Sequence, residues 1–363
     1  MMCESASQWG LDLSVLAAAQ DDAAVAGAPD VVVGAPHDHD LVRAWATGCD
    51  VITFDHELVD LDFFAEIEAS GVVVAPSPRA LKFATSKAFQ RTQMADAGIP
   101  VPKFLVLASY DRDAVDAFVA AAPHGVVVKA DRGGYDGRGV LTPSTNAEVH
   151  DAVRDMLVAG AVVLEERVQL LQEIAGLLVR GRRGDQVAYP LVTTVQRDGM
   201  CVEVTYPTRL DPDLLEEAQD VVRRVGDQVD AVGVLAVELF VTPDGVLLNE
   251  VATRPHNSGH WTIEGCTTSQ FENHLRAVAG LPLGGTAALF PNATMVNVVG
   301  SATPGSLVDA LAVPGAHIHD YGKAWRPGRK LGHVTVVGTG PDVRVRAWEG
   351  AEALGTSATK ESS

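Results

Sequence analysis

Short apolar segments alternate with amphipathic ones along the first part of the chain. Apolar runs at Leu11–Leu16, Val31–Val33, Val51–Phe54 and Val72–Ala75 are separated by segments with helical periodicity. Strands that alternate with helices in this way are typical of a parallel sheet built from β-α-β units. We therefore predict that the chain begins with a parallel-sheet domain.

The very start of the chain departs from this pattern. Met1–Gly10 has a helical pattern, whereas sheets of this kind usually open with a strand and a glycine-rich turn. Leu11–Leu16 thus stands where a second strand is expected. We expect that Met1 is an internal methionine, and that about ten upstream residues, carrying a strand and a glycine turn, belong to the working protein. Without that strand, the sheet would expose the hydrogen-bonding edges of its neighbours.

The middle of the chain combines helical and β patterns. The expected strands are Val126–Lys129, Gly139–Thr142, Val162–Glu165, Ile174–Val179, Val187–Pro190 and the two that flank Thr242–Gly245. The expected helices are Thr85–Ala97, Ala114–Ala122, Asn146–Ala159 and Asp213–Val229. Thr145 and Glu148 have the spacing of a capping box at the start of the third helix.

A change in composition divides the chain further. After Pro282 the sequence becomes rich in glycine, proline and short β segments. We predict an α/β fold with a parallel-sheet domain at 1–86, a central α+β domain at 87–280 and a small β-rich domain at 281–355. Residues 356–363 should form a disordered tail.

Charge and cysteine content exclude several classes of function. The chain has 28 basic and 47 acidic residues, for a net charge of −19, which disfavours nucleic acid or an anionic membrane as partner. Four widely spaced cysteines (Cys3, Cys49, Cys201, Cys266) fit reduced thiols better than disulfides or a zinc site. No apolar run reaches the ~18 residues of a membrane span, and we expect no signal peptide. We expect a cytoplasmic protein.

Two carboxylates stand in neighbouring apolar strands. Glu238 lies in V-L-A-V-E-L-F-V and Glu250 ends V-L-L-N-E, on either side of a hairpin turn. With Pro243–Gly245 as the loop, Thr242 faces Val246 and Glu238 faces Glu250. Facing carboxylates repel unless a divalent cation lies between them, so the pair predicts an Mg²⁺ site, with Mn²⁺ as an alternative metal. Two solvent-facing acids on an edge hairpin are the other interpretation, which the apolar neighbours disfavour.

Asn249 adds an oxygen ligand beside this pair, and the segment that follows is rich in polar chemistry. Within a dozen residues of Glu250 the sequence V-A-T-R-P-H-N-S-G-H-W supplies an arginine, two histidines and an asparagine. Such a concentration after a buried strand indicates a binding site.

Four glycines between residues 133 and 139 follow the strand that ends at Lys129. The loop A-D-R-G-G-Y-D-G-R-G leads into another strand and not into a helix, so it is neither a Walker loop nor a Rossmann turn. A glycine-rich β-hairpin can fold over a triphosphate, with its N–H groups as donors and Lys129 as a point charge. A mobile surface hairpin is the alternative. Downstream, Val162–Val168 could present backbone groups to an adenine edge, although such a segment alone is more often core.

Two further clusters are candidate substrate contacts. Tyr321–His333 contains four cations in eight residues around a Pro-Gly turn, which suits a phosphate monoester, or else forms a solvated hairpin tip. Asp55-His56-Glu57 follows the strand Val51–Phe54, where open parallel sheets bind ligands. This second cluster could equally cap a helix.

Together these segments resemble the ATP-grasp enzymes, and within them the N5-carboxyaminoimidazole ribonucleotide synthases. The resemblance rests on G-G-Y-D-G-R-G, N-E-V-A-T-R-P-H-N-S-G-H-W-T, S-Q-F-E-N-H-L-R and R-P-G-R-K-L-G-H, spread from residue ~50 to ~335. It implies a pre-ATP-grasp, an ATP-grasp and a C-terminal β-rich domain. It also implies a purine-biosynthesis ligase that converts ATP, bicarbonate and 5-aminoimidazole ribonucleotide to N5-carboxyaminoimidazole ribonucleotide, ADP and phosphate through carboxyphosphate.

The resemblance also implies a role for each candidate residue. For ATP and its metal, the expected residues are Lys129, Gly133, Gly134, Gly137 and Gly139 (triphosphate), Glu165, Glu166, Arg167 and Val168 (adenine), Glu173 (ribose), Asn249, and Glu238 with Glu250 (Mg²⁺). For the other substrates they are Arg254 (bicarbonate and carboxyphosphate), Tyr135, Asp136, Arg138, His256 and Asn257 (aminoimidazole), Asp55, His56 and Glu57 (ribonucleotide), and Lys323, Arg329 and Lys330 (5′-phosphate). A homodimer is usual in the family.

The chain departs from the family pattern at three places. Phe83 replaces an arginine four residues before Lys87, Gln196 replaces a frequent histidine, and the opening glycine motif is absent. Two alternatives remain beside the carboxylating enzyme: a formate-dependent glycinamide ribonucleotide transformylase with the same fold, and an inactive ATP-binding homologue. A dinucleotide oxidoreductase is disfavoured because no Rossmann turn precedes a helix.

Overall fold

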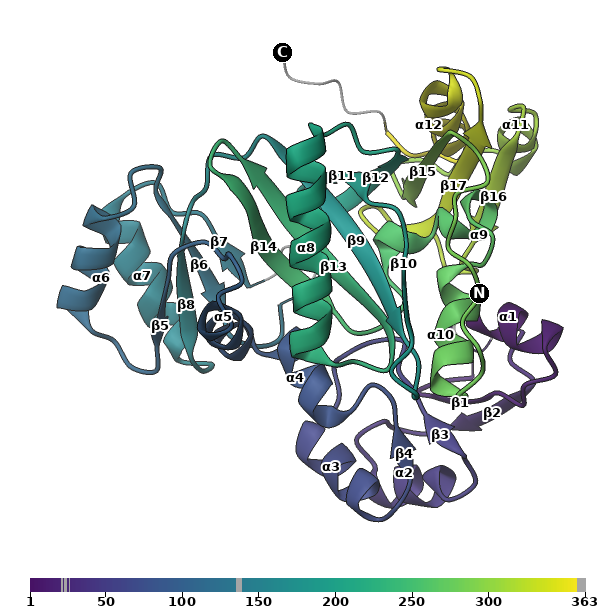
Figure 1. Ribbon diagram of the computed structural model, residues 1–363, viewed down its shortest axis with the longest axis horizontal. Helices are drawn as coiled ribbons and strands as arrows, with labels where there is room; N and C mark the ends of the chain where they lie inside the picture. The colour runs from purple at the N-terminus through teal and green to yellow at the C-terminus, as the bar shows by residue number, and fades with distance from the viewer. Residues whose placement is uncertain (21, 23–24, 26, 135–138, 358–363) are drawn as a thin grey trace.

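The computed structural model describes residues 1–357 except 21, 23–24, 26 and 135–138. Its centre is a nine-stranded antiparallel sheet with strand order β14-β13-β9-β11-β12-β15-β17-β16, in which β10 pairs with β9 (Figure 1). The strands are β9 Gln172–Arg180, β10 Gln186–Ala188, β11 Val192–Arg197, β12 Met200–Tyr206, β13 Gly233–Thr242, β14 Gly245–Ala252, β15 Asn292–Val299, β16 Ala316–Asp320 and β17 Lys330–Gly338.

The middle strands of this sheet are buried on both faces. On β9, Ile174 packs toward the long helix α8 (Pro212–Val229), whereas Leu177 packs on the opposite face with Trp261 and the side of α10 (Gln270–Val278). Successive side chains of a strand point to opposite faces, so a nearly continuous apolar sequence is required here. Burying one such side chain stabilises the fold by roughly 1.5–3 kcal/mol.

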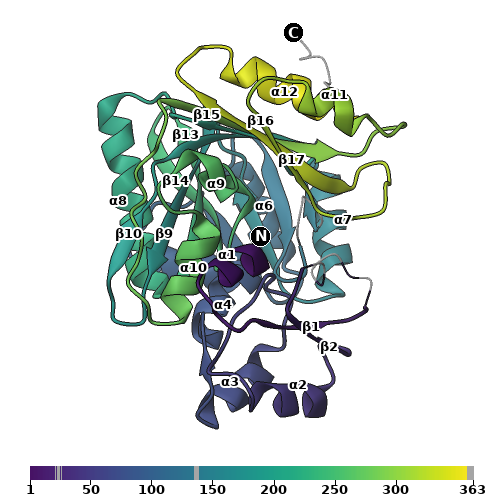
Figure 2. The same ribbon diagram turned by 90° about the vertical axis from the view of Figure 1, so that its right-hand side faces the viewer.

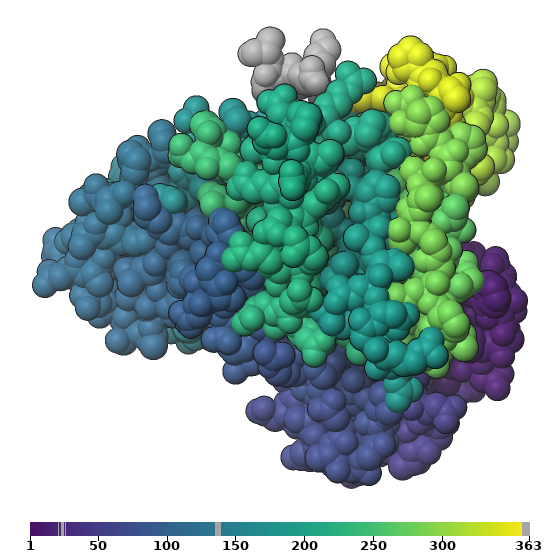
Figure 3. Space-filling view, in the orientation of Figure 1, coloured from purple at the N-terminus to yellow at the C-terminus, as the bar shows by residue number. Residues whose placement is uncertain are grey.

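A four-stranded antiparallel sheet forms a separate lobe that projects from the body of the molecule (Figures 1 and 3). Its order is β5-β8-β6-β7, and α6 and α7 cover it. The elements are β5 Phe104–Leu107, α6 Arg112–Ala120, β6 Val126–Ala130, β7 Val140–Leu141, α7 Asn146–Leu157 and β8 Val162–Glu166. The antiparallel β6–β7 pairing confirms the predicted glycine hairpin at its described ends.

The predicted capping box at the start of α7 forms with one change of partner. Thr145 Oγ1 accepts from the Glu148 backbone N–H at 3.2 Å, as expected. The Glu148 carboxylate, however, accepts from the backbone N–H of Ser144 at 2.7 Å rather than from that of Thr145. Two backbone N–H groups at the start of the helix, those of Ser144 and Glu148, therefore each have a side-chain acceptor.

The N-terminal region contains two separate parallel strand pairs. β1 pairs with β2 and β3 pairs with β4, but among the described residues neither pair bonds to the other, so the single predicted sheet is divided. Figure 1 shows these elements in the lower part of the molecule, with α1 at the right beside α10. They are α1 Met2–Gln8, β1 Ser14–Ala17, β2 Asp30–Val33, α2 His39–Ala46, β3 Val51–Ile52, α3 Leu61–Ala69, β4 Val73–Val74 and α4 Pro78–Thr85.

Several predicted boundaries were wrong. The helix expected at Thr85–Ala97 begins instead at Lys87, because Ser86 ends α4 and its Oγ caps α5 (Lys87–Asp96). Strands β5, β11 and β12 were not predicted. The large sheet contains strands from both sides of residue 280, since β12 pairs with β15, and the domain boundary at 280–281 stays a prediction.

The C-terminal strands carry their own helical cover. α11 (Leu307–Leu311) and α12 (Val343–Ala353) lie side by side over β15–β17, as Figure 2 shows. The remaining short helices, η2 (Asn257–Gly259) and α9 (Thr262–Gly265), follow β14. None of the described helices has both the length and the apolar character needed to cross a membrane.

Candidate active site

Glu238 and Glu250 are cross-strand partners on β13 and β14, as predicted. The predicted route to this pairing was wrong, however. Thr242 pairs with Gly245, so the loop has two residues and not three. An irregularity at Asn249, the unpaired residue of a β-bulge, then shifts the register by one and brings the two carboxylates opposite each other.

The two carboxylates differ in protonation. Burial, together with the charge of Glu250, raises the pKa of Glu238 to about 8. Burial also acts to raise the pKa of Glu250, but Lys87, whose Nζ lies 2.8 Å from Glu250 Oε1, lowers it overall. Glu238 is thus the member of the pair that needs a further cation to hold its charge.

Lys87 was not among the predicted site residues. It is the first residue of α5, where the helix dipole disfavours a cation. A lysine directly after a serine cap therefore indicates a carboxylate partner elsewhere in the fold, and this pattern could have identified Lys87 as a candidate site residue.

The carboxylate pair fits a metal held jointly by protein and nucleotide. Among the described residues no group of three or more His, Cys, Asp or Glu side chains is arranged to hold a metal. Mg²⁺ typically binds one or two carboxylates and completes its shell with phosphates and water. Glu238 and Glu250 match that donor set.

A buried charge cluster joins the lobe to the large sheet. Glu165 on β8 accepts from Arg91 Nε at 2.7 Å and lies 2.6 Å from Lys129 Nζ, while Arg91 Nη2 donates to the backbone carbonyl of Asn249 at 2.6 Å. Although burial acts against it, the two cations lower the pKa of Glu165 to about 2. Glu165, which was expected near adenine, thus forms an ion pair with Lys129. Arg91 was not among the predicted site residues.

The other predicted nucleotide residues surround this cluster. The Glu166 carboxylate accepts from the backbone N–H of Lys103 and lies 3.1 Å from its Nζ; the Arg167 backbone N–H donates to Gly125. Val168 lies two residues past the end of β8.

Glu173 lies on β9, two strands from Glu250. Burial raises the pKa of its carboxyl group, and Gln196 forms a hydrogen bond to it. Gln196, which departs from the family pattern, therefore serves as the partner of a half-buried carboxylate.

The glycine hairpin is described only at its two ends. Gly133 and Gly139 have positive φ angles of 78° and 71°, and Gly139 lies 3.5 Å from Gly134 at the position a Cβ would occupy. Such a backbone favours glycine. The predicted residues Tyr135, Asp136, Gly137 and Arg138 lie outside the described residues.

Arg254 is oriented by a predicted substrate residue. Its Nε donates to Glu57 Oε2 at 2.6 Å, and Glu57 Oε1 accepts from the backbone N–H of Thr253 at 3.2 Å. Glu57 therefore positions the guanidinium. Its neighbours Asp55 and His56 are exposed and line the cavity described below.

His256 connects Arg254 to the carboxylate pair. Its Nδ1 accepts from the backbone N–H of Ser258 at 3.3 Å, so the proton of the neutral ring is on Nε2, which lies 3.6 Å from Glu238 Oε1. Burial, with the charges of Arg254 and Lys330, lowers the pKa of His256 to about 3. The ring is a neutral donor.

The C-terminal cations are placed differently from one another. Lys330, the first residue of β17, is close enough to influence the pKa of both Glu238 and His256. Lys323 lies with its Nζ 5.3 Å from the ring centre of Tyr321, at the cavity. Arg329 Nη1 donates to the carbonyl of Ala324 in its own loop at 3.2 Å.

A cavity of about 1970 Å³ lies where the N-terminal strand pairs meet the rest of the molecule. Its lining brings together predicted residues from distant parts of the chain: Asp55, His56, Arg254 and Lys323. His260 and Tyr321, which were not predicted as site residues, also line it.

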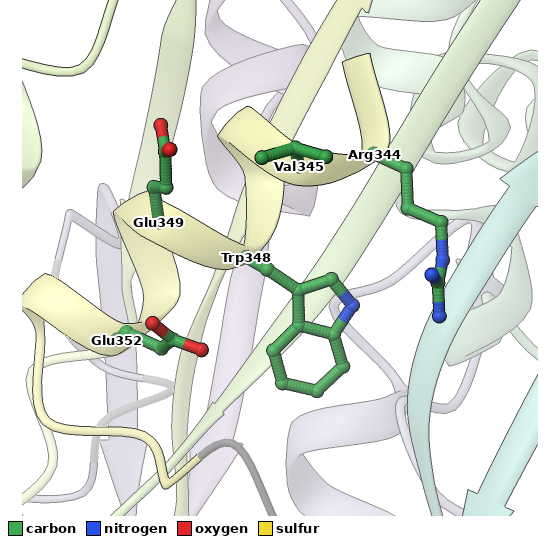
Figure 4. Close-up of a pocket in the computed structure, with 5 residues that line it drawn as sticks. All are labelled: Arg344, Val345, Trp348, Glu349 and Glu352. Atoms are coloured by element: carbon green, nitrogen blue, oxygen red, sulfur yellow. The ribbon is translucent and has the colours of Figure 1, made fainter. Parts of the chain in front are cut away.

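A smaller hollow of about 260 Å³ lies on α12. Figure 4 shows Arg344 and Trp348 extending from the same side of this helix, whereas Glu349 points the other way. Arg344 Nε and Trp348 Nε1 donate to the two oxygens of the buried Glu203, at 2.7 and 2.6 Å. These side chains anchor α12 to the sheet, and the hollow carries no candidate chemistry.

Three protein-family models match consecutive parts of the chain. They are described as a ribonucleotide synthetase preATP-grasp domain (residues 1–85), an ATP-grasp domain (92–271) and a phosphoribosylaminoimidazole carboxylase C-terminal domain (293–344). The order of the three confirms the predicted fold class.

Curated relatives and solved structures agree with these matches. An N5-carboxyaminoimidazole ribonucleotide synthase of Mycobacterium tuberculosis is 46% identical over 93% of this chain and 81% of its own length. The Thermus thermophilus synthetase structure matches with a TM-score of 0.89 and 32% identity over 99% of this chain and 97% of its own. An Aspergillus clavatus structure in complex with ADP and 5-aminoimidazole ribonucleotide matches with a TM-score of 0.87 and 30% identity, over 98% and 95%.

Proposed function

This chain belongs to the N5-carboxyaminoimidazole ribonucleotide synthases, the ATP-grasp ligases of purine biosynthesis, and we propose that its carboxyl donor is bicarbonate and its metal Mg²⁺. The observation that carries this proposal is the 3.6 Å contact between His256 Nε2 and Glu238 Oε1. His256 lies two residues after Arg254, so this contact supports a site in which the residues proposed for the substrate lie beside the carboxylates that suit a metal.

The proposed reaction has two steps. A bicarbonate oxygen attacks the γ-phosphorus of ATP; the new P–O bond forms as the bond to the β-phosphate oxygen breaks, and ADP leaves. The amine of the ribonucleotide then attacks the carbonyl carbon of carboxyphosphate. A C–N bond forms, phosphate leaves, and the amine loses a proton.

The nucleotide side of the site is built around two lysines. Lys87 and Lys129 are both anchored by carboxylates, Glu250 and Glu165, and both would bind triphosphate oxygens. Mg²⁺ held by Glu238 and Glu250 would neutralise phosphate charge during transfer. The glycine hairpin would close over the phosphates and exclude water from the short-lived intermediate.

The substrate side is built around Arg254. Its guanidinium, fixed by Glu57, would bind the bicarbonate and carboxyphosphate oxygens. His256 would bind the aminoimidazole as a neutral donor, and Asn257 would assist it. In the cavity, Asp55 and His56 would contact the ribonucleotide; Lys323, Arg329 and Lys330 would bind its 5′-phosphate.

An assay with single omissions tests this proposal. ADP release should require ATP, Mg²⁺, 5-aminoimidazole ribonucleotide and bicarbonate together, measured in buffer stripped of carbon dioxide before bicarbonate is restored. Formate should not replace bicarbonate. ADP release driven by formate and glycinamide ribonucleotide would instead assign the transformylase reaction.

We also propose a homodimer in the cytoplasm. Leu307, Val308 and Leu311 are exposed on α11, next to the exposed Val345 on α12, and an apolar patch of this kind suits an interface. Four free cysteines fit a reducing compartment. Light scattering should give a dimer for the wild-type protein and a monomer for Leu311→Glu; a wild-type monomer would contradict the proposal.

A further inference from the structure

Three histidines and a tyrosine meet where the segment after β14 packs on β16 and β17. His333 stacks on His319 with ring centres 4.4 Å apart, and lies 4.8 Å from the ring of His260. The hydroxyl of Tyr321 lies between two of these rings, 3.1 Å from His260 Nδ1 and 2.9 Å from His333 Nδ1. Of this group, His260, His319 and Tyr321 line the cavity that Arg254 also lines, whereas His333 does not.

The direction of the hydrogen bonds on one side is fixed by a backbone carbonyl. Asn297 is fully buried, and its Nδ2 donates to the carbonyl of Cys201 at 2.8 Å, which fixes the orientation of its amide. Its Oδ1 must therefore accept from Asn257 Nδ2, at 3.0 Å. The second proton of that Asn257 amide points to His260 Nδ1 at 3.4 Å. His260 Nδ1 is therefore an acceptor.

The other side of the cluster completes the assignment. His333 Nε2 is buried without a hydrogen-bond partner. A buried N–H without an acceptor is rarer than an unpaired lone pair, so the proton of His333 is on Nδ1 and is donated to Tyr321. The Tyr321 hydroxyl oxygen accepts this hydrogen bond, so its own O–H donates to His260 Nδ1.

A single tautomer of His260 follows from both sides. Burial lowers its pKa well below the usual value, so the ring is neutral, and with Nδ1 as an acceptor its proton is on Nε2. Nδ1 faces the buried network, and Nε2 is at the opposite edge of a ring that lines the cavity.

We propose that Tyr321 is a positioning residue that fixes His260 as an Nε2–H donor to an acceptor atom of the ribonucleotide. This inference rests on the proposed function for the identity of the ligand. The tautomer itself does not depend on the ligand, so it can be measured in the protein alone.

The first measurement is the ¹⁵N spectrum of ring-labelled histidine in the substrate-free protein. In the wild type, His260 Nδ1 should give the signal of an unprotonated nitrogen and Nε2 that of a protonated one. In Tyr321→Phe, the Nδ1 signal should move toward the protonated position, because only the longer bond from Asn257 Nδ2, at 3.4 Å, then remains to favour an unprotonated Nδ1. Tyr110→Phe is the matched control, because Tyr110 Oη also meets a histidine Nδ1, that of His150 at 3.0 Å, in the distant lobe; it should leave the His260 signals unchanged.

The second measurement separates positioning from general damage. Tyr321→Phe should raise the KM for the ribonucleotide about 3- to 10-fold, as expected when one neutral hydrogen bond is weakened, with kcat and the KM for ATP nearly unchanged. An unchanged His260 tautomer, or an equal rise in both KM values, would overturn the inference. Failure of the wild-type omission assay would instead count against the proposed function and leave the tautomer result standing.

A second pair of variants covers the case in which Tyr321→Phe does not fold. His333→Asn keeps an amide N–H where His333 Nδ1 donates, whereas His333→Leu removes it. The asparagine variant should retain the wild-type tautomer of His260 and the wild-type KM for the ribonucleotide. The leucine variant should show a changed His260 tautomer and a raised KM for the ribonucleotide. Identical behaviour of the two would show that His333 and Tyr321 do not set the His260 proton.

Discussion

At the scale of single residues, the two facing carboxylates of the site differ in what each does for the fold. Glu250 is neutralised by Lys87, whereas Glu238 has a pKa of about 8 and is mostly protonated at neutral pH without a metal. Removing the charge of Glu238 should therefore cost the unliganded protein nothing. Removing that of Glu250 should leave Lys87 without its partner.

A pair of amide variants tests this difference. Glu238→Gln should keep the wild-type Tm yet lower turnover by at least ~10²-fold, the scale of losing one electrostatic stabiliser of the transition state. Glu250→Gln should lower both Tm and turnover. Calorimetry and the ADP assay measure these effects. Near-normal turnover in Glu238→Gln would remove it from the metal site.

The buried Glu165 predicts a pH dependence of stability. Its pKa is lowered from 4.5 to about 2 in the folded protein, so the ionised form stabilises the fold above pH 4.5, and this contribution disappears as the pH falls from 4.5 to 2. Glu165→Gln leaves Arg91 and Lys129 buried without a charged partner and should cost ~3–5 kcal/mol at neutral pH.

Denaturant titrations at several pH values measure this contribution. The stability difference between wild type and Glu165→Gln should shrink between pH 4.5 and 2. Glu166→Gln is the control, because its partner Lys103 is largely exposed and the pair should contribute less than ~1 kcal/mol. A pH-independent difference for Glu165→Gln would contradict the assignment.

At the scale of elements, the break between α4 and α5 places Lys87 at the site. Ser86 Oγ accepts from the backbone N–H of Phe89 at 3.2 Å and donates to Asp131 Oδ1 at 2.8 Å. The serine thus starts α5 and ties it to the end of β6. A helix that began at Thr85, as the sequence predicted, would include Ser86 in its first turn and remove it from the cap position.

Two serine caps provide a matched test. Ser86→Ala should reduce stability by about 1 kcal/mol and also raise the KM for ATP, because Lys87 loses its fixed position. Ser77→Ala removes the cap of α4, where Ser77 Oγ accepts from Ala80 at 3.3 Å, and should reduce stability alone. Equal ATP KM values for the two variants would show that the Ser86 cap has no role in placing Lys87.

At the scale of the whole molecule, residues from all three matched domains line the cavity of the candidate site. Asp55 comes from the N-terminal strands, Arg254 from the segment after β14, and Lys323 from the C-terminal region, and all three line one cavity. A ligand that contacts all of them would hold the domains together, so its binding should stabilise the complete chain.

The contribution of the C-terminal region can be measured with one cation. Lys323→Ala should raise the KM for the ribonucleotide by roughly 10- to 150-fold, corresponding to a charged hydrogen bond of about 1.5–3 kcal/mol, with little change in the KM for ATP. Arg112→Ala, an exposed cation on α6 paired with Asp116, is the control and should change neither. An unaltered ribonucleotide KM in Lys323→Ala would place the phosphate elsewhere.

The sequence alone determined the features that depend on local pattern. Apolar periodicity predicted the strands that carry Lys129, Glu238 and Glu250, and the glycine spacing predicted a hairpin and not a helix after β6. The motifs also identified the family. Side-chain alternation and turn chemistry act over a few residues, so they can be read from a single stretch of chain.

Only the tertiary structure decided which charges meet and which protons they hold. The bulge at Asn249, the pairing of Arg91 with Glu165 and the Tyr321 network join segments as much as 158 residues apart. Glu238 and Glu250 were predicted to face each other, and they do, but for a different reason. The predicted loop was one residue too long, and the bulge at Asn249, which was not predicted, shifts the register by the same one residue. Long-range packing sets burial and neighbouring charge, and these in turn set protonation, which local sequence patterns do not encode.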